Sequence, residues 1–295
     1  MAEKISRRQA LAGAGAVGLA AAAAPSAFAA PDWDKPIDLH MHVEPGTPDY
    51  APFGTTDQMV MQNYASRLAY MDRLGITKAI VSAGYRYRRA EGIANTRAMN
   101  DMIAAFVAKN PARFPAGIGV VEVKDGDASL KELERMAKVL KLRGVGWHHG
   151  DGGVYIDNPY MRPLLKQTQA LGLIPFIHVR EKEFEAWWRL EVLLEEFPDM
   201  TFVAMSGLVT TDDREHAIQV CRRRKNVLVD TAPALYGGDQ FFPSFVKTVG
   251  AERILYGSDN APTLTLEVIR RSALSDQDKA LILSGNTAKL FGLKV

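Results

Sequence analysis

Pro36-Ile37-Asp38-Leu39-His40-Met41-His42 is a short apolar run that ends in two histidines. Residues i and i+2 of a strand share one face and lie about 6 to 7 Å apart along it, so both imidazoles would point the same way. Because imidazole nitrogens bind zinc at about 2.0 to 2.1 Å, the two side chains can converge on one ion beyond the strand end. The pair is equally consistent with two histidines that bind no metal and lie in the core or on the surface.

Seven similar runs follow, each separated from the next by a helical pattern. The expected strands are 37–42, 78–82, 116–122, 144–148, 174–178, 201–206, 227–231 and 254–258. The expected helices are 56–75, 95–109, 129–142, 159–171, 181–197, 212–224, 241–249 and 264–273, with two short helices from Asp276 onward.

This alternation predicts parallel strands, because a hairpin cannot join parallel neighbours and each connection must cross over through a helix. Eight such units favour a closed, single-domain (β/α)8 TIM barrel, and the length of the chain suits one domain of this kind. An open doubly wound sheet is the alternative. No Gly-x-Gly-x-x-Gly turn follows any expected strand, so nothing in the sequence indicates a dinucleotide site.

The first 29 residues have the pattern of a twin-arginine export signal. Arg7 and Arg8 precede a weakly apolar stretch, and Ala27-Phe28-Ala29 has the small-x-small form of a cleavage site. The alternatives are an ordinary N-terminal helix or a membrane anchor, but the stretch is too short to span about 30 Å of hydrocarbon. We therefore expect the twin-arginine machinery to export the protein to the periplasm or beyond, with residues 30–295 forming the barrel domain.

Composition excludes some partners. The whole chain has a net charge of +2, and removal of residues 1–29 brings it to zero, so there is no general electrostatic attraction to nucleic acid or to an anionic membrane. The single cysteine, Cys221, cannot form an internal disulfide and is expected to be a buried structural thiol.

The chemically capable side chains fall at the ends of the expected strands. The ends of barrel strands meet at one rim, where active sites are built. These residues are His40 and His42 on the first strand, His148 and His149 on the fourth, His178 on the fifth and Asp259 on the eighth. Imidazoles together with one carboxylate suit a divalent cation such as Zn²⁺. Asp230, on the seventh strand, is expected either beside the metal or as a structural acceptor.

Several segments together resemble the amidohydrolase-related family of the metal-dependent hydrolase superfamily. They are Ile37-Asp38-Leu39-His40-Met41-His42, Gly144-Val145-Gly146-Trp147-His148, Pro175-Phe176-Ile177-His178, Asn226-Val227-Leu228-Val229-Asp230-Thr231, Ile254-Leu255-Tyr256-Gly257-Ser258-Asp259 and the closing stretch from Gly285 to Leu293. The resemblance implies a (β/α)8 barrel and one divalent metal ion. It also implies the ligands His40, His42, His178 and Asp259.

One departure from that family concerns the sixth strand. Many members end it with histidine and glycine, whereas this chain has Ser206-Gly207. Serine has no group that titrates near neutral pH, so it cannot replace the histidine as a proton carrier. Either His148 or His149 takes that role, or the activity is different or lost. The fourth strand also lacks the lysine that binuclear members carbamylate, which favours one metal ion.

The expected activity is hydrolysis of a C–O or C–N bond in a lactone, ester or amide. A divalent ion would lower the pKa of its bound water from about 15.7 to near 7. Asp259 would orient that water and take its proton, and His148 would polarise the carbonyl or protonate the leaving group. The alternatives are a metal-dependent decarboxylase of a small aromatic or unsaturated acid, and a degenerate barrel that only binds a ligand.

The expected substrate is a small acidic molecule. Tyr85-Arg86-Tyr87-Arg88-Arg89 directly follows the second strand, and arginine side chains suit carboxylates, so Arg86 and Arg88 are candidate substrate contacts together with His149. A solvated cationic loop is the alternative interpretation of this stretch.

Overall fold

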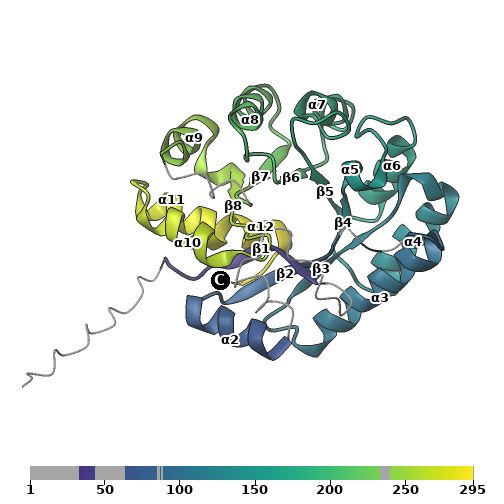
Figure 1. Cartoon of the computed structure of the whole chain (residues 1–295), viewed down its shortest axis with the longest axis horizontal. Helices are drawn as coiled ribbons and strands as arrows, with labels where there is room; N and C mark the ends of the chain where they lie inside the picture. Colours follow the sequence, from purple (N-terminus) through teal and green to yellow (C-terminus); the bar gives the residue numbers. More distant parts are fainter. Residues whose placement is uncertain (1–32, 44–63, 85–86, 88, 233–239, 295) are drawn as a thin grey trace, which may run out of the picture. The chain divides into compact units, whose positions relative to one another are not determined.

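Eight parallel strands form the centre of the structure. The computed structural model describes residues 33–43, 64–84, 87, 89–232 and 240–294, which belong to one compact unit, Asp32–Val295. The strands are β1 (Ile37–Val43), β2 (Lys78–Ala83), β3 (Ala116–Val120), β4 (Gly144–Trp147), β5 (Ile174–His178), β6 (Phe202–Met205), β7 (Val227–Asp230) and β8 (Ile254–Leu255), and they pair in sequence order (Figure 1). The predicted single-domain (β/α)8 barrel is confirmed.

The first strand closes the sheet against the chain that follows the last strand. The backbone N–H of Leu39 donates to the carbonyl of Tyr256 at 2.9 Å, and the N–H of Asp259 donates to the carbonyl of His40 at 2.8 Å. These bonds bring Asp259 beside β1, although the two are far apart in the sequence.

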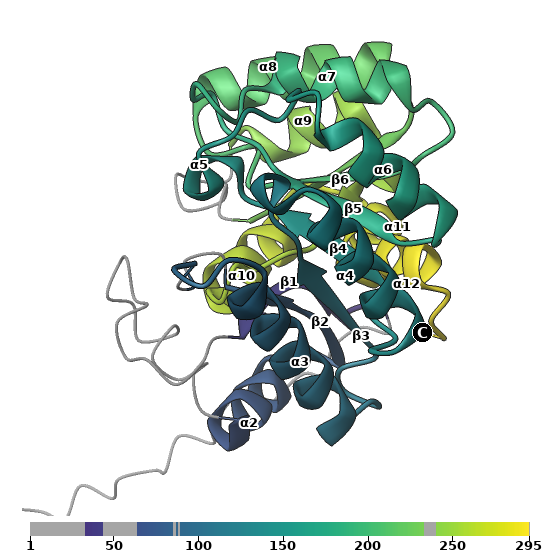
Figure 2. The ribbon, with the colours of Figure 1, turned by 90° about the vertical axis from the view of Figure 1, so that its right-hand side faces the viewer.

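Helices surround the strands on the outside, as the two views show (Figures 1 and 2). They are α2 (Tyr64–Leu74), α3 (Ile93–Lys109), α4 (Asp127–Lys138), α5 (His149–Gly152), α6 (Met161–Ala170), α7 (Trp187–Glu196), α8 (Thr211–Arg223), α9 (Phe242–Val249), α10 (Pro262–Arg271), α11 (Asp276–Ala280) and α12 (Asn286–Phe291). The main core lies between the strands and this helical layer, because the strands are buried on both faces.

The helix expected over 181–197 begins later, at Trp187. The preceding segment folds into a turn in which the N–H of Arg180 donates to the carbonyl of Glu185 at 2.9 Å. The Glu181 carboxylate accepts from the backbone N–H of Trp187 at 3.2 Å, which satisfies one of the free amides in the first turn of the helix. Residues 179–186 therefore form a fixed connection above the end of β5.

Some sequence expectations fall outside the described residues. The twin-arginine signal over residues 1–29, the start of the helix expected from Thr56, and the candidate substrate contacts Arg86 and Arg88 all lie there. Within the part of the chain that the structure describes, no helix is both long and apolar enough to cross a bilayer.

Candidate metal centre

The first cluster at the barrel rim consists of His40, His42 and Asp259. Both histidines are buried, and the Asp259 side chain is 28% exposed. Nε2 of His40 lies 2.9 Å from Nε2 of His42. Oδ1 of Asp259 lies 3.2 Å from Nε2 of His42 and 3.9 Å from Nε2 of His40. Three potential ligand atoms, from β1 and from the segment that follows β8, therefore lie close to one another.

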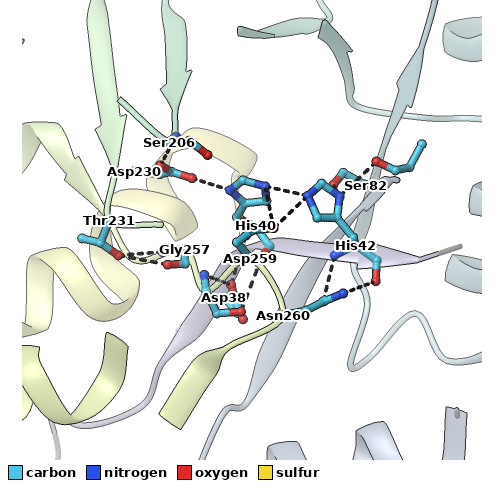
Figure 3. A network of polar contacts seen from close by, with 12 residues as sticks. Asp38, His40, His42, Ser82, Ser206, Asp230, Thr231, Gly257, Asp259 and Asn260 are labelled. Atoms are coloured by element: carbon cyan, nitrogen blue, oxygen red, sulfur yellow. Dashed lines mark hydrogen bonds and ion pairs between the residues drawn. The ribbon is translucent and has the colours of Figure 1, made fainter. Parts of the chain in front are cut away.

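The other ring nitrogen of each histidine is occupied by a protein acceptor. Nδ1 of His40 lies 2.6 Å from Oδ2 of Asp230, and Nδ1 of His42 lies 3.0 Å from the Ala83 carbonyl and 2.9 Å from Oγ of Ser82 (Figure 3). A proton on each Nδ1 serves these acceptors and leaves the lone pair on Nε2. This is the arrangement in which a carboxylate or a carbonyl orients a histidine toward a metal ion.

The donor set fits a divalent ion. Ligand atoms about 2.0 to 2.2 Å from one ion lie about 3 to 3.5 Å apart. Two of the three separations in this cluster are close to this range, and the third, between Asp259 and His40, is longer at 3.9 Å. Two Nε2 lone pairs that face each other at 2.9 Å repel unless a cation or a proton lies between them. Two imidazoles and one carboxylate are also ligand types that divalent transition metals accept.

The charges of the cluster favour cation binding. Burial alone lowers the pKa of His40, but the carboxylate of Asp230 beside Nδ1 overrides it and raises the pKa to about 9. Burial lowers the pKa of His42. Burial would raise the pKa of Asp259, but the hydrogen bond with His42 and the charge of His40 bring it down to about 2. Asp259 is therefore a carboxylate, and His40 keeps a proton that a bound cation would replace.

Three residues near this cluster have unusual backbone conformations. Ser206, Asp259 and Asn260 have φ values of 59°, 49° and 60°, in the left-handed region that costs energy for residues other than glycine. Oδ1 of Asn260 accepts from the N–H of His42 at 3.0 Å, and its Nδ2 donates to the carbonyl of the same residue at 3.2 Å. Strained residues of this kind cluster at functional sites, where neighbouring contacts hold them in place.

A second cluster consists of His148, His178 and Glu185. Nδ1 of His148 and Nδ1 of His178 each lie 3.0 Å from the same oxygen, Oε1 of Glu185. The two imidazole rings stack with their centroids 3.8 Å apart. Burial would raise the pKa of Glu185, but its contacts with both histidines lower it well below the usual range. A buried carboxylate thus holds the histidines from the ends of β4 and β5 together.

His148 has partners for Nδ1 in either protonation state. When Nδ1 is deprotonated, it accepts from the backbone N–H of Asp151 at 3.2 Å, a contact that caps α5. When it is protonated, it can donate to Oε1 of Glu185. The His148 side chain is 22% exposed, so it can also be reached from the rim. An imidazole with these contacts can carry a proton.

The structure divides the four expected ligands between the two clusters. His40, His42 and Asp259 lie together, whereas His178 joins His148 and Glu185. Burial lowers the pKa of His178 to about 4, and at a pH where this imidazole is protonated its charge helps to lower the pKa of Asp259. Asp230 contacts His40, so of its two expected positions the structure supports the one beside the candidate metal ligands.

One expected substrate contact, His149, is buried. His149 is 2% exposed, and its Nδ1 lies 3.0 Å from the carbonyl of Val154, so one ring nitrogen is engaged by the backbone. Within the basic stretch that follows β2, Arg89 is paired with Glu122 at 2.7 Å, and Tyr87 donates to the same carboxylate at 2.6 Å. These described members of the stretch are held by protein acceptors.

Comparisons with known proteins extend this description. The sequence profile of the family described as amidohydrolase matches residues 37–293. A 2-amino-3-carboxymuconate-6-semialdehyde decarboxylase from Dictyostelium discoideum is 31% identical over 98 residues, which make up 33% of this chain and only 27% of that relative.

Two solved structures share the fold. The 2,6-dihydroxybenzoate decarboxylase from Rhizobium has a TM-score of 0.71 and 20% identity, with 88% of this chain and 99% of that chain covered. A dihydroxybenzoic acid decarboxylase from Polaromonas sp. JS666, with bound manganese and an inhibitor, has a TM-score of 0.70 and 19% identity, with 88% and 97% covered.

The expected hydrolase is wrong, because these relatives are all decarboxylases. The Polaromonas structure contains manganese, whereas the sequence of this chain had suggested zinc. The family profile covers the barrel from the first residue of β1 to Leu293, almost the end of the chain. The chain therefore belongs to the amidohydrolase family.

Proposed function

We propose that this chain is a metal-dependent decarboxylase of a small aromatic or unsaturated carboxylic acid. The observation that carries the proposal is the cluster of His40, His42 and Asp259, whose ligand atoms lie 2.9 to 3.9 Å apart. The activities of the similar proteins, which share either part of the sequence or the fold, supply the reaction class.

His40, His42 and Asp259 would hold the ion, and His178 is the fourth proposed ligand. When bound, the ion would supply positive charge that binds substrate oxygens and stabilises the negative charge that develops as CO₂ leaves. Asp230 keeps Nε2 of His40 available through its contact with Nδ1. The protein would thus hold the positive charge of the ion at one place on the rim before the substrate binds.

The reaction also requires a proton. The bond between the ring or chain carbon and the carboxylate breaks, its electron pair stays on that carbon, and a proton must then form the new C–H bond. Ser206 cannot supply this proton near neutral pH. We assign the role to His148, which is partly exposed and has a partner for Nδ1 in both protonation states.

Metal analysis of the purified protein tests the ion site. We expect one divalent ion per chain in the wild type and none retained after gel filtration in His40→Ala or Asp259→Ala. The donor set suits Zn²⁺ and Mn²⁺, and elemental analysis identifies which ion the protein carries. Equal trace metal in the wild type and in both variants would refute the ligand assignment.

The reaction itself is tested with hydroxybenzoic acids and muconate-type acids and the metal-loaded protein, while CO₂ and organic products are measured together. We expect one CO₂ for each acid consumed and a product with hydrogen in place of the carboxylate. A product that has gained water without loss of CO₂ contradicts decarboxylation. Tight binding of an acid with no turnover indicates instead a barrel that only binds its ligand.

We also propose export of the protein by the twin-arginine pathway. Support comes from Arg7-Arg8, the apolar stretch behind them and Ala27-Phe28-Ala29. Replacement of both arginines by lysine should keep the protein in the cytoplasm, and mass spectrometry of the exported form should find an N-terminus near Ala30. An exported double variant would contradict this proposal.

A further inference from the structure

Glu185 lies in the connection between β5 and α7 and is buried, with 1% of its surface exposed. Its Oε1 accepts a hydrogen bond from the backbone N–H of Gly150 at 2.8 Å, and the same atom lies 3.0 Å from Nδ1 of both His148 and His178. One carboxylate oxygen therefore touches three groups from the ends of two neighbouring strands.

The local fold fixes this carboxylate. The backbone N–H of Glu185 donates to the carbonyl of Lys182 at 3.0 Å, and its carbonyl accepts from the N–H of Arg180 at 2.9 Å. A side chain at Gly150 would also be crowded, since a Cβ there would lie 3.1 Å from the Glu185 carboxyl group. The absence of a side chain at Gly150 lets the carboxylate reach its backbone N–H.

These three ionisable side chains could in principle hold a second cation. The backbone donors argue against that interpretation. Gly150 N–H already points at Oε1 of Glu185, and Asp151 N–H points at Nδ1 of His148, so two of the lone pairs that an ion would need accept hydrogen bonds instead. Partial positive charge from these N–H groups favours a carboxylate at this place and opposes a cation.

The position of Glu185 relative to His178 has a different consequence. Among the described residues, no aligned hydrogen bond reaches Nδ1 of His178, and Glu185 is the polar group beside it. An anion at this distance favours a proton on Nδ1, which leaves the lone pair on Nε2. The same relation holds at His40, where Asp230 occupies Nδ1.

We propose that Glu185 is a positioning residue that fixes the ring orientation and tautomer of His178 for metal binding and holds His148 stacked beside it. This inference depends on the proposed function, because it treats His178 as a ligand of the ion at His40, His42 and Asp259. It adds a carboxylate from outside the strand ends to the residues that build the site.

The experiment compares the wild type with Glu185→Ala and with the isosteric Glu185→Gln. Glu181→Gln is the matched control, because Glu181 lies in the same connection and pairs with His216 on α8 at 2.9 Å, away from both clusters. Dissociation constants for Mn²⁺ and Zn²⁺ are measured by competition with a chelator. Ring-nitrogen chemical shifts of His178 are recorded by NMR on the metal-free proteins.

We expect both Glu185 variants to bind the ions about 10- to 100-fold more weakly, as for other carboxylates that orient metal-binding histidines, and the control to stay within about twofold. The ring shifts should show a proton on Nδ1 of His178 in the wild type and in the control. In Glu185→Ala they should show a mixture of tautomers.

The two proposals can fail separately. Unchanged affinity and unchanged His178 ring shifts in the Glu185 variants would overturn the positioning role, whatever the reaction is. Two ions per wild-type chain, with one lost in Glu185→Ala, would also overturn it in favour of a second metal site. If no acid loses CO₂ but the variants still show weaker ion binding and altered ring shifts, the positioning role stands and the decarboxylase proposal fails.

Discussion

Nδ1 of His40 lies 2.6 Å from Oδ2 of Asp230, although 190 positions separate the two residues in the chain. The other oxygen of Asp230 accepts from the backbone N–H of Ser206 at 2.9 Å. One carboxylate from β7 thus connects the first histidine of the candidate metal centre to the strained end of β6.

Asp230→Asn tests this connection. Asparagine can still accept from Ser206 through its oxygen, but its NH₂ group then faces Nδ1 of His40 and donates to it. The proton of His40 would move to Nε2, where it blocks the metal position. We expect the dissociation constant for a divalent ion, measured by chelator competition, to rise about 10- to 100-fold.

The matched control for that experiment is Asp212→Asn, because Asp212 is exposed in the first turn of α8. The affinity of the Asp212→Asn variant for the ion should stay within about twofold of the wild type. If Asp230→Asn binds the ion as tightly as this control does, the contact between Asp230 and His40 has no role in metal binding.

Gly257 lies just after β8, where the chain passes behind His40. A Cβ at this position would lie 2.8 Å from Cβ of His40 and 3.0 Å from Oδ2 of Asp230, so the backbone or the histidine would have to shift. Overpacking of this kind costs about 1 to 3 kcal/mol. We expect Gly257→Ala to lower the free energy of unfolding by that amount, measured by urea denaturation, and also to weaken ion binding.

Gly285→Ala is the control for Gly257→Ala. A Cβ at Gly285 would meet its nearest neighbour at 3.5 Å, an ordinary contact, within a helical segment. Its stability should equal or exceed that of the wild type, and its affinity for the ion should not change. Equal losses of stability and of ion affinity in both variants would mean that crowding beside His40 does not cause them.

The barrel could be predicted because each strand is a short apolar run between helical patterns, and local sequence sets this alternation. The end of β8 could not be predicted in the same way. The strand ends at Leu255, since the N–H of Gly257 donates to Oγ1 of Thr231 and the N–H of Ser258 donates to Oδ1 of Asp38. These side-chain partners depend on the folded arrangement, which the sequence pattern does not reveal.

The same distinction applies to the site. His40, His42 and Asp259 could be identified because residues of the right type stand at strand ends, and strand ends meet at one rim. Glu185 could not be identified, since it stood within an expected helix. Its place beside His148 and His178 depends on the turn that the Arg180–Glu185 backbone bond closes. No spacing in the sequence signals that turn.

His148→Gln and Ser206→Ala compare the proposed proton carrier with the residue that stands where many members of the resembled family have a histidine. His148 is partly exposed and in contact with Glu185, whereas the Ser206 side chain is buried and has no group that titrates near neutral pH. With an acid that the wild type decarboxylates, we expect kcat to fall about 10²- to 10⁴-fold in His148→Gln and less than about threefold in Ser206→Ala. Ion affinity measured alongside shows whether the loss comes from proton transfer or from the metal site. The reverse order of the two kcat values would remove His148 from the mechanism.

His149 gives the fold a dependence on pH. Burial lowers the pKa of this histidine to about 4, and its Nδ1 lies 3.0 Å from the carbonyl of Val154. The unfolded chain has a histidine pKa of about 6.5, so between these two values the unfolded state binds a proton that the folded state excludes. The free energy of unfolding must therefore fall as the pH drops through this window, by up to about 3 kcal/mol for this one group.

His149→Asn tests this dependence, because the asparagine amide can still donate to the Val154 carbonyl but takes up no proton. Urea denaturation from pH 7 to pH 4, with a chelator present throughout, should show a smaller loss of stability in His149→Asn than in the wild type. His216→Asn is the control, since the His216 side chain is 47% exposed and its replacement should leave the slope as in the wild type. Parallel slopes for the wild type and His149→Asn would show that the buried imidazole takes up its proton without opposing the fold.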